Sequence, residues 1–271
     1  RVAVAVAVIA AILGALAFHF LWPRDVAAPQ VQAPTPPVPP APAPSAQLEP
    51  AVRHPVSRIP VPPATDTADA AAALPKLDDS DGVANDVIGA IVGGDGFVRL
   101  LVSDGIVRRI VATVDNLPRR TIAAQVLPIK PVPGPFATVE LAGGTAIDGA
   151  NAVRYAPYVR AAEAIDASRL AGFYVRLYPL FQQAYVELGY PNGYFNDRLI
   201  GVIDHLLSAP EPKSPVYLAQ PKVLFEFADP ELEALSAGQK MLVRVGVDNE
   251  RRLKAKLREI RAALTGTPTR P

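Results

Sequence analysis

Proline is spread very unevenly along this chain, and its distribution decides which part can build a packed core. Fourteen of the 30 prolines lie in residues 23–73, a stretch without glycine or aromatic residues. Such a segment cannot bury enough apolar surface to offset the chain entropy lost on folding. We therefore expect residues 23–73 to be a disordered, semi-rigid spacer that reaches at most about 160 Å. The alternative for its proline-dense residues 36–44 is a docking ligand for an aromatic groove.

An uninterrupted apolar run precedes this spacer. Residues 2–22 carry no charged side chain and end in Phe18, Phe20 and Trp22, which resemble an interfacial aromatic belt. About 20 helical residues cross a hydrocarbon layer of ~30 Å. The run is longer than the apolar core of a signal peptide, and Pro29 disfavours cleavage after residue 28. We therefore predict that residues 1–22 are a retained transmembrane signal anchor.

The orientation of this anchor follows from the charge at its ends. Arg1 lies on the near side, and the positive-inside rule places that side in the cytoplasm. The rest of the chain would then be exported. Because the sequence begins with arginine and not methionine, we expect residues to be missing before Arg1.

The chain changes character at Leu74, where glycine appears and all eight tyrosines follow. The whole chain has 271 residues, is 50% hydrophobic and has a net charge of +1, which excludes a fully disordered protein. The absence of cysteine excludes disulfides, zinc ribbons, iron–sulfur clusters and cysteine nucleophiles. We predict one compact domain over residues 74–266, which is large enough for a single core, and a tail over residues 267–271.

Apolar periodicity predicts that this domain is mainly α, an α+β class with one minor β-hairpin. The expected helices run from Ser80 or Asp81 to Gly93, from about Asp104 to before Pro118, from Asp166 to Gly189, from Phe195 to Leu207, from Ser236 to Val245 and from Asp248 or Asn249 to Gly266. Pro179 is expected to kink or split the third helix. Residues 136–141 and 145–147 predict the hairpin, and residues 216–227 are expected to be extended in part.

Five blocks of the domain resemble a known family. They are Val111–Arg119, Leu177–Pro191, Tyr194–Leu199, Gln220–Pro230 and Leu235–Lys240. They look like the bacterial domain of unknown function 3014 family, over roughly residues 74–264. The resemblance implies a bacterial protein with an N-terminal membrane segment, a proline-rich spacer and one soluble domain. It implies no activity. Together with the orientation of the anchor, it predicts a single-pass inner-membrane protein whose C-terminal domain is periplasmic.

The helix expected at residues 195–207 is the best place for an acid–base group. Asp197, Arg198, Asp204 and His205 fall within one arc of about 120°. These groups could serve as general base, acid and anion clamp, but any amphipathic helix shows such a face to water. Asp115 and Glu226 are a second candidate pair. Without a G-x-S-x-G nucleophile motif, we keep an envelope hydrolase only as the alternative.

Other chemistries find little support. The three histidines, His19, His54 and His205, lie in different regions, and residues 78–81 lack the spacing of a calcium loop. We therefore expect no metal and no cofactor.

The last helix carries a net charge of +4, which suits a solvated face, intramolecular docking or an anionic partner. An exported domain has no nucleic acid to bind. The aromatic stripe on residues 174–185 is either core or a stacking platform.

Three loop segments are candidates for binding a partner, because loops often carry function on a rigid scaffold. The candidate residues are Asp115, Asn116, Arg119, Tyr190, Asn196, Asp197, Arg198, Gln220 and Lys222. The alternative is internal bonding, with Asn196 and Asp197 starting a helix and Asp115 paired with Arg119. The binding hypothesis predicts that the three segments meet in one concave patch. We accordingly favour a non-enzymatic binding or scaffold module for an envelope protein or wall polymer.

Overall fold

The structure, a computed structural model, describes residues 52–60, 74–92, 101–130, 132 and 134–266. Its helices are α3 (Asp81–Val92), α5 (Ile106–Asn116), α6 (Ala150–Glu163), α7 (Ala167–Glu187), α8 (Phe195–Leu207), α9 (Pro230–Glu233), α10 (Ala237–Arg244) and α11 (Val247–Thr265). Its strands are β1 (Thr138–Leu141), β2 (Gly144–Ile147), β3 (Leu218–Ala219) and β4 (Glu226–Phe227). The prediction of a mainly helical domain with a small antiparallel hairpin is confirmed.

The predicted membrane anchor at residues 1–22 and most of the predicted spacer lie outside the described residues. None of the helices that the structure describes combines the length and the apolar character needed to cross a bilayer.

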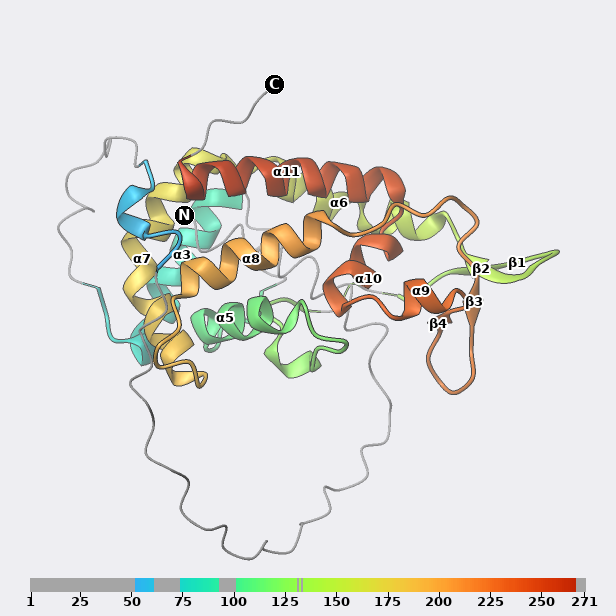
Figure 1. Cartoon of the computed structure of the whole chain (residues 1–271), viewed down its shortest axis with the longest axis horizontal. Coiled ribbons are helices and arrows are strands. Elements are labelled where there is room, and N and C mark those ends of the chain that lie inside the picture. Colours follow the sequence, from blue (N-terminus) through green and yellow to red (C-terminus); the bar gives the residue numbers. More distant parts are fainter. Residues whose placement is uncertain (1–51, 61–73, 93–100, 131, 133, 267–271) are drawn as a thin grey trace, which may run out of the picture.

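The core is built where the apolar stripes of α5, α7, α8 and α11 face one another (Figure 1). Ile106, Ile110 and Val114 of α5 are all fully buried, as their four-residue spacing predicts. The stripe expected on the last helix is buried too, from Leu253 to Leu264. Helix α11 also covers α6 and contacts α10, so this one helix packs against α6, α7, α8 and α10. Burial of these stripes provides most of the hydrophobic stabilisation of the domain.

The aromatic stripe of α7 is part of this core. Tyr174, Phe181 and Tyr185 are buried, and the ring of Phe181 stacks on that of Phe195 with centroids 5.9 Å apart. Tyr185 stacks in the same way on Tyr190, at 4.6 Å. The core interpretation is therefore correct, and these rings are not a platform for a ligand.

A smaller unit of strands and short helices adjoins the helical core, at the right-hand end of Figure 1. Strand β1 pairs antiparallel with β2, and β3 pairs antiparallel with β4. A bridge between Ala146 and Tyr217 connects the two hairpins. Leu218, Phe227 and Val243 form a separate apolar cluster that joins β3 and β4 to α10. This cluster places the β3–β4 connection against α10.

Three predictions about elements need correction. Helices α6 and α9 were not predicted, because the prolines around and within α6 obscure its periodicity. Pro179 does not divide α7, which runs unbroken through it. An interior proline costs about 3 kcal/mol, but Leu177, Leu180 and Phe181 on either side are buried, and their packing outweighs that loss. Finally, α11 begins after Gly246, whose φ of 88° suits glycine, and not at a side-chain cap from Asp248 or Asn249.

Residues 52–60 correct the predicted extent of the spacer, because they pack against the domain. The side chains of Val56 and Ile59 are buried. The amides of Arg53 and His54 donate to the two carboxylate oxygens of Asp197, at 2.9 and 2.7 Å. We call residues 52–60 the strap. Two apolar side chains and satisfied amides are enough to order it despite its prolines.

The strap also explains two polar residues that were expected to start α8. The Nδ2 of Asn196 donates to the carbonyl of His54 at 2.7 Å, and Tyr194 accepts the amide of Val56 at 2.9 Å. The residue that precedes α8, Tyr194, makes no side-chain cap. Asn196 and Asp197 therefore bind the strap and do not cap their own helix.

Candidate functional site

Asp115, near the end of α5, is the centre of a buried polar cluster. Its side chain is 2% exposed. Arg198 Nε donates to Oδ1 at 3.0 Å, Arg119 Nη2 to Oδ2 at 2.5 Å, and the Tyr190 hydroxyl to Oδ2 at 3.1 Å. The structure thus brings together the first two predicted binding segments. Both carboxylate oxygens of Asp115 accept hydrogen bonds from these side chains. Asp115 therefore holds the loops after α5 and α7 together.

The remaining candidates for partner binding lie elsewhere. Asn116 donates to the carbonyl of Ala112 within its own helix, and Asn196 is fully buried beneath the strap. Gln220 and Lys222 are exposed in the β3–β4 connection, where Gln220 bonds locally to the carbonyl of Val223. In Figure 1 this connection projects at the right-hand end. The side chains that bond to Asp115 thus come from the first two segments, whereas Gln220 and Lys222 belong to the third.

The candidate acid–base residues of α8 have separate structural partners. Asp197 binds the strap, and Asp204 pairs with Arg261 of α11. His205 Nε2 lies 2.8 Å from the Ser236 hydroxyl, and burial, followed by the nearby charge of Arg198, lowers its pKa. The structure does not gather these groups, or Glu226 of β4, around one point of attack.

A pocket of about 180 Å³ opens between the loop after α5, the β3–β4 connection and α10. The loop is held close to α10 because the amides of Ala237 and Gly238 donate to the carbonyls of Arg119 and Leu117, at 2.7 and 2.9 Å. Glycine at residue 238 permits this close approach, since a Cβ there would lie 2.6 Å from a methyl carbon of Leu206 and 3.2 Å from the carbonyl oxygen of Leu117. These contacts fix one wall of the pocket.

Three cations line this pocket, and we call it the cationic pocket. They are Arg120 of the loop and Lys240 and Arg244 of α10. Arg244 is only 5% exposed, and its guanidinium lies 4.6 Å from the centre of the Phe227 ring. Burial lowers the pKa of Arg244 to about 9. A cation held at this depth has lost most of its contact with water.

Two carboxylates accompany the cations. Glu233 of α9 forms an ion pair with Lys240 and accepts the amide of Phe227 at 2.9 Å. Glu226 is exposed at the rim. With three cations against two anions, the lining of the pocket carries a net charge of +1.

Among the residues that line the pocket, sequence reasoning singled out Glu226 and missed the three cations, although it selected segments beside them. The predicted segments that end at Arg119 and Lys222 stop just short of lining residues Arg120 and Leu224. A signal was present on the predicted helix after Ser236, where Lys240 and Arg244 are four residues apart and therefore share a face. Ser236 itself is confirmed as a helix cap, and it forms a capping box with Gln239.

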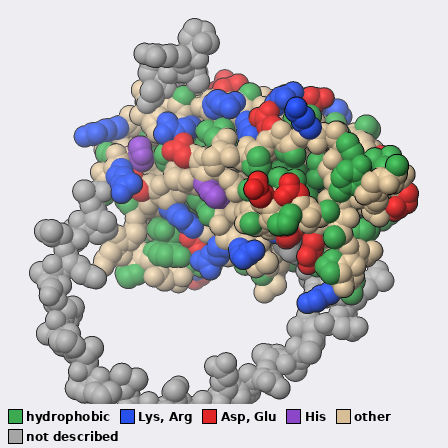
Figure 2. Space-filling model, turned by 45° about the vertical axis from the view of Figure 1, so that its right-hand side comes forward, with side chains coloured by type: hydrophobic (Ala, Val, Ile, Leu, Met, Phe, Trp, Pro, Cys, Tyr) green, Lys and Arg blue, Asp and Glu red, His purple; other side chains and the backbone are tan. Residues whose placement is uncertain are grey.

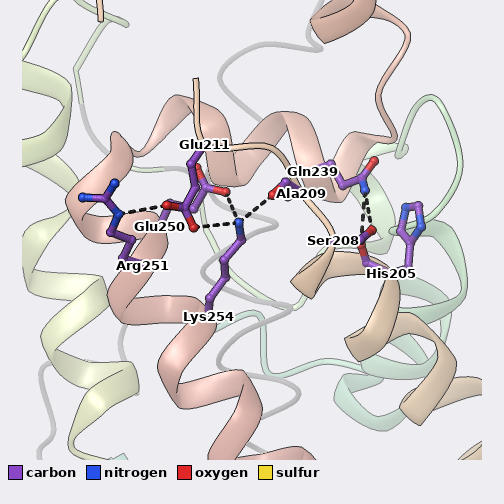
Figure 3. A network of polar contacts seen from close by, with 8 residues as sticks. All are labelled: His205, Ser208, Ala209, Glu211, Gln239, Glu250, Arg251 and Lys254. Carbon is purple, nitrogen blue, oxygen red and sulfur yellow. Dashed lines mark hydrogen bonds and ion pairs between the residues drawn. The ribbon is translucent and has the colours of Figure 1, made fainter. Parts of the chain in front are cut away.

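A second buried network, shown in Figure 3, lies at the start of α11. Glu250 is 0% exposed, and Lys254 Nζ is 2.8 Å from its Oε1. Lys254 also donates to the carbonyl of Ala209 at 2.6 Å and pairs with Glu211 at 3.1 Å. The network ties α11 to the segment after α8. Among the described residues, no group of three or more histidine and carboxylate side chains is arranged to hold a metal ion.

The fold and the pocket define a small, mainly helical domain of the α+β class. Residues 106–261, more than half of the chain, match the model of a family described as "Protein of unknown function (DUF3014)". The chain belongs to this family, which confirms the resemblance noted in its sequence blocks. The match does not include the strap, α3 or the predicted membrane anchor. No curated protein and no solved structure is similar enough to this chain to count as a match.

Proposed function

We propose that this protein is a non-enzymatic binding module, held on the periplasmic side of the bacterial inner membrane by residues 2–22. The proline-rich segment between the anchor and the strap would set its distance from the bilayer. Its partner would be an envelope protein or a wall polymer.

The observation that carries this proposal is the cationic pocket. Three separate segments of the chain form it, and it combines buried positive charge with apolar walls from Leu224, Phe225 and Met241. Concave sites that pair apolar walls with a few charged groups are typical of ligand recognition. Of the five acid–base candidates, only Glu226 lines this pocket. Recognition therefore explains the arrangement better than hydrolysis.

Binding is tested with photocrosslinking amino acids in the full chain, in living cells. Val223, beside the pocket, is 74% exposed, and Val153 on α6 is 75% exposed. The two positions thus form a matched pair. We expect a discrete adduct from residue 223 and none from residue 153. No adduct from residue 223, or the same adducts from both positions, would contradict a binding role for this end of the domain.

The proposed periplasmic location of the domain is tested separately, by adding a protease to spheroplasts that contain the full chain. A periplasmic domain is cut while a cytoplasmic marker protein stays intact. Protection of the domain until the inner membrane is lysed would exclude the proposed orientation.

A further inference from the structure

The strap lies on α7 and α8 as a peptide ligand lies on its receptor, and we call the surface beneath it the strap site. We propose that this site docks an extended segment of another protein, one that places a hydroxyl or carboxamide side chain near the position of Val56. The strap is then a built-in competitor that the partner segment displaces. This surface is not the cationic pocket, so the inference goes beyond the proposed function.

The strap site holds the strap through its main chain. Asp197 accepts two successive amides, Asn196 donates to one carbonyl, and Tyr194 accepts a third amide. All of these bonds are made to main-chain groups of residues 53–56. Main-chain hydrogen bonds provide affinity for an extended segment without reading its sequence. A segment of another protein can therefore make the same bonds.

The side chains of the strap add little sequence information. The buried ones are those of Val56 and Ile59, three residues apart, whereas Ser57 and Arg58 are exposed. The strap also packs against α7. The site thus selects an extended main chain with two apolar side chains, which is the way that many peptide-binding sites work.

Two buried polar atoms at the strap site have no hydrogen-bond partner among the described residues. They are Oδ1 of Asn196, a residue that is 0% exposed, and the hydroxyl of Tyr174, which is 1% exposed. The amide group of Asn196 reaches the strap through its Nδ2. Burial raises the pKa of the Tyr174 hydroxyl, and the neighbouring Tyr194 and Asp197, both partners of the strap, add to this shift. Both atoms are therefore close to the bound strap.

These unpaired atoms make the strap an incomplete ligand. A buried polar group without a partner has lost its hydration and gained no bond in return, so a ligand that pairs it binds more tightly. Asn196 Oδ1 needs a donor, and the Tyr174 hydroxyl needs an acceptor. A hydroxyl or a carboxamide provides both functions, whereas Val56 provides neither. The partner segment therefore carries serine, threonine, asparagine or glutamine near this position.

The same atoms distinguish another protein from a second copy of this chain. The strap of a second copy would make the same contacts and leave the same atoms unpaired. The strap in place also has the advantage of belonging to the same chain, which gives it an effective concentration on the order of millimolar. A segment from another molecule displaces it only by making additional contacts. Pairing Tyr174 and Asn196 provides them.

The strap site and the cationic pocket lie at opposite ends of the domain. Figure 1 shows the strap, in blue, beside α7 at the left, whereas α9 and α10 lie toward the right. Figure 2 brings the right-hand end forward and shows acidic, basic and apolar side chains interspersed on it. A partner at one site therefore leaves the other accessible, and the two sites can be tested separately.

The test uses fluorescent peptides and the full chain in detergent micelles. The first peptide, the strap peptide, has the sequence of residues 52–60. The second carries Val56→Thr, which adds a hydroxyl with little change in shape, and the third carries Ile59→Thr as the matched control. Each peptide is titrated against the parent chain and against a chain with Ile59→Ser. This substitution weakens the strap within its own chain, because it removes one of the two buried apolar side chains.

We expect the strap peptide to bind the Ile59→Ser chain at least about tenfold more tightly than the parent, because a weakened strap competes less. The Val56→Thr peptide should bind about threefold to tenfold more tightly than the strap peptide, since it pairs the two atoms. The Ile59→Thr peptide should bind more weakly, because it loses apolar burial. Adding Asp197→Ala to the Ile59→Ser chain should weaken binding at least about tenfold, whereas adding Asp204→Ala should leave it unchanged.

Displacement of the strap is measured in the parent chain, which keeps the test decisive if the Ile59→Ser chain does not fold. At saturation, the Val56→Thr peptide should accelerate hydrogen exchange at the amides of Arg53 and His54 about tenfold or more. Exchange within α5, a helix of the core, should not change.

Three results would overturn the inference. The first is a folded Ile59→Ser chain that binds the strap peptide no better than the parent does. The second is a Val56→Thr peptide that binds no more tightly than the strap peptide, which would mean that bound water already pairs the two atoms. The third is peptide binding that leaves exchange at Arg53 and His54 unchanged. None of them alters the crosslinking result at Val223, so the strap site and the cationic pocket fail separately.

Discussion

Asp115, on α5, joins side chains from the loop after α5, the loop after α7 and helix α8. Removing a buried carboxylate strands the groups that were paired with it, which costs far more than losing an exposed pair. We predict that Asp115→Ala lowers the free energy of unfolding by about 3 kcal/mol. The measurement is denaturant unfolding followed by circular dichroism.

Two comparisons make this prediction specific. Arg119 is 55% exposed, so Arg119→Ala should cost less than about 1 kcal/mol. Asp79→Ala, at an exposed position, should stay within about 0.5 kcal/mol of the parent. A loss in Asp115→Ala no greater than in Asp79→Ala would mean that the cluster does not hold the loops.

Glu250 makes the stability depend on pH. Burial raises its pKa above the ordinary value of 4.5, and Lys254 opposes this shift only in part. The folded chain therefore keeps this proton at pH values where the unfolded chain has lost it, so the contribution of Glu250 to stability grows as pH falls from neutral toward 4.5. We predict that the stability of the parent relative to Glu250→Gln increases over that range.

Glu163 provides a control of opposite sign. Its hydrogen bond with Arg252 lowers its pKa, so its contribution is present above pH 4.5 and is lost as pH falls through its folded-state value. The stability of the parent relative to Glu163→Gln should therefore decrease on acidification. Identical pH profiles for the two variants would refute the assigned environments.

At the scale of elements, the strap provides the clearest prediction. Asp197→Ala removes the acceptor of two successive amides, at Arg53 and His54. We expect hydrogen exchange at these amides to accelerate about tenfold or more, because local opening no longer breaks two charge-assisted bonds.

Asp204→Ala is the matched control for the strap. It lies on the same helix but pairs with Arg261, so it should leave exchange at the strap unchanged. Equal acceleration in both variants would show that the strap depends on α8 as a whole and not on Asp197.

The elements also show what sequence alone can and cannot predict. Helices with a clear apolar stripe, such as α5 and α11, were predictable because the apolar residues that recur at helical spacing in the sequence are the residues that the fold buries. Helix α6 was not, since Pro157 lies within it and tertiary contacts, among them those with α11, compensate for the lost hydrogen bond. The strap was missed for a similar reason. Its composition resembles the spacer, and its partners lie about 140 residues away.

The candidate site, too, could be predicted from the sequence only where its contacts are local. The Asp115–Arg119 pair is a local contact across the turn that ends α5, so its short separation in the sequence predicted it. The cationic pocket needs Arg120, Leu224 and Arg244 to meet, and only tertiary packing brings such distant residues together. Turn residues in the sequence indicated segments near the pocket, but of the residues that line it only Glu226 was a candidate.

At the scale of the whole molecule, we propose that an N-terminal anchor and a spacer hold a domain whose cationic pocket binds a partner. The most direct measurement is the yield of the crosslinked adduct from residue 223 in cells, with and without the charge of Arg120. We predict a severalfold loss of adduct in Arg120→Ala at equal protein levels. We predict no loss in Arg169→Ala, which removes the same charge from an exposed position that does not line the pocket. An adduct that persists undiminished in Arg120→Ala would contradict the claim.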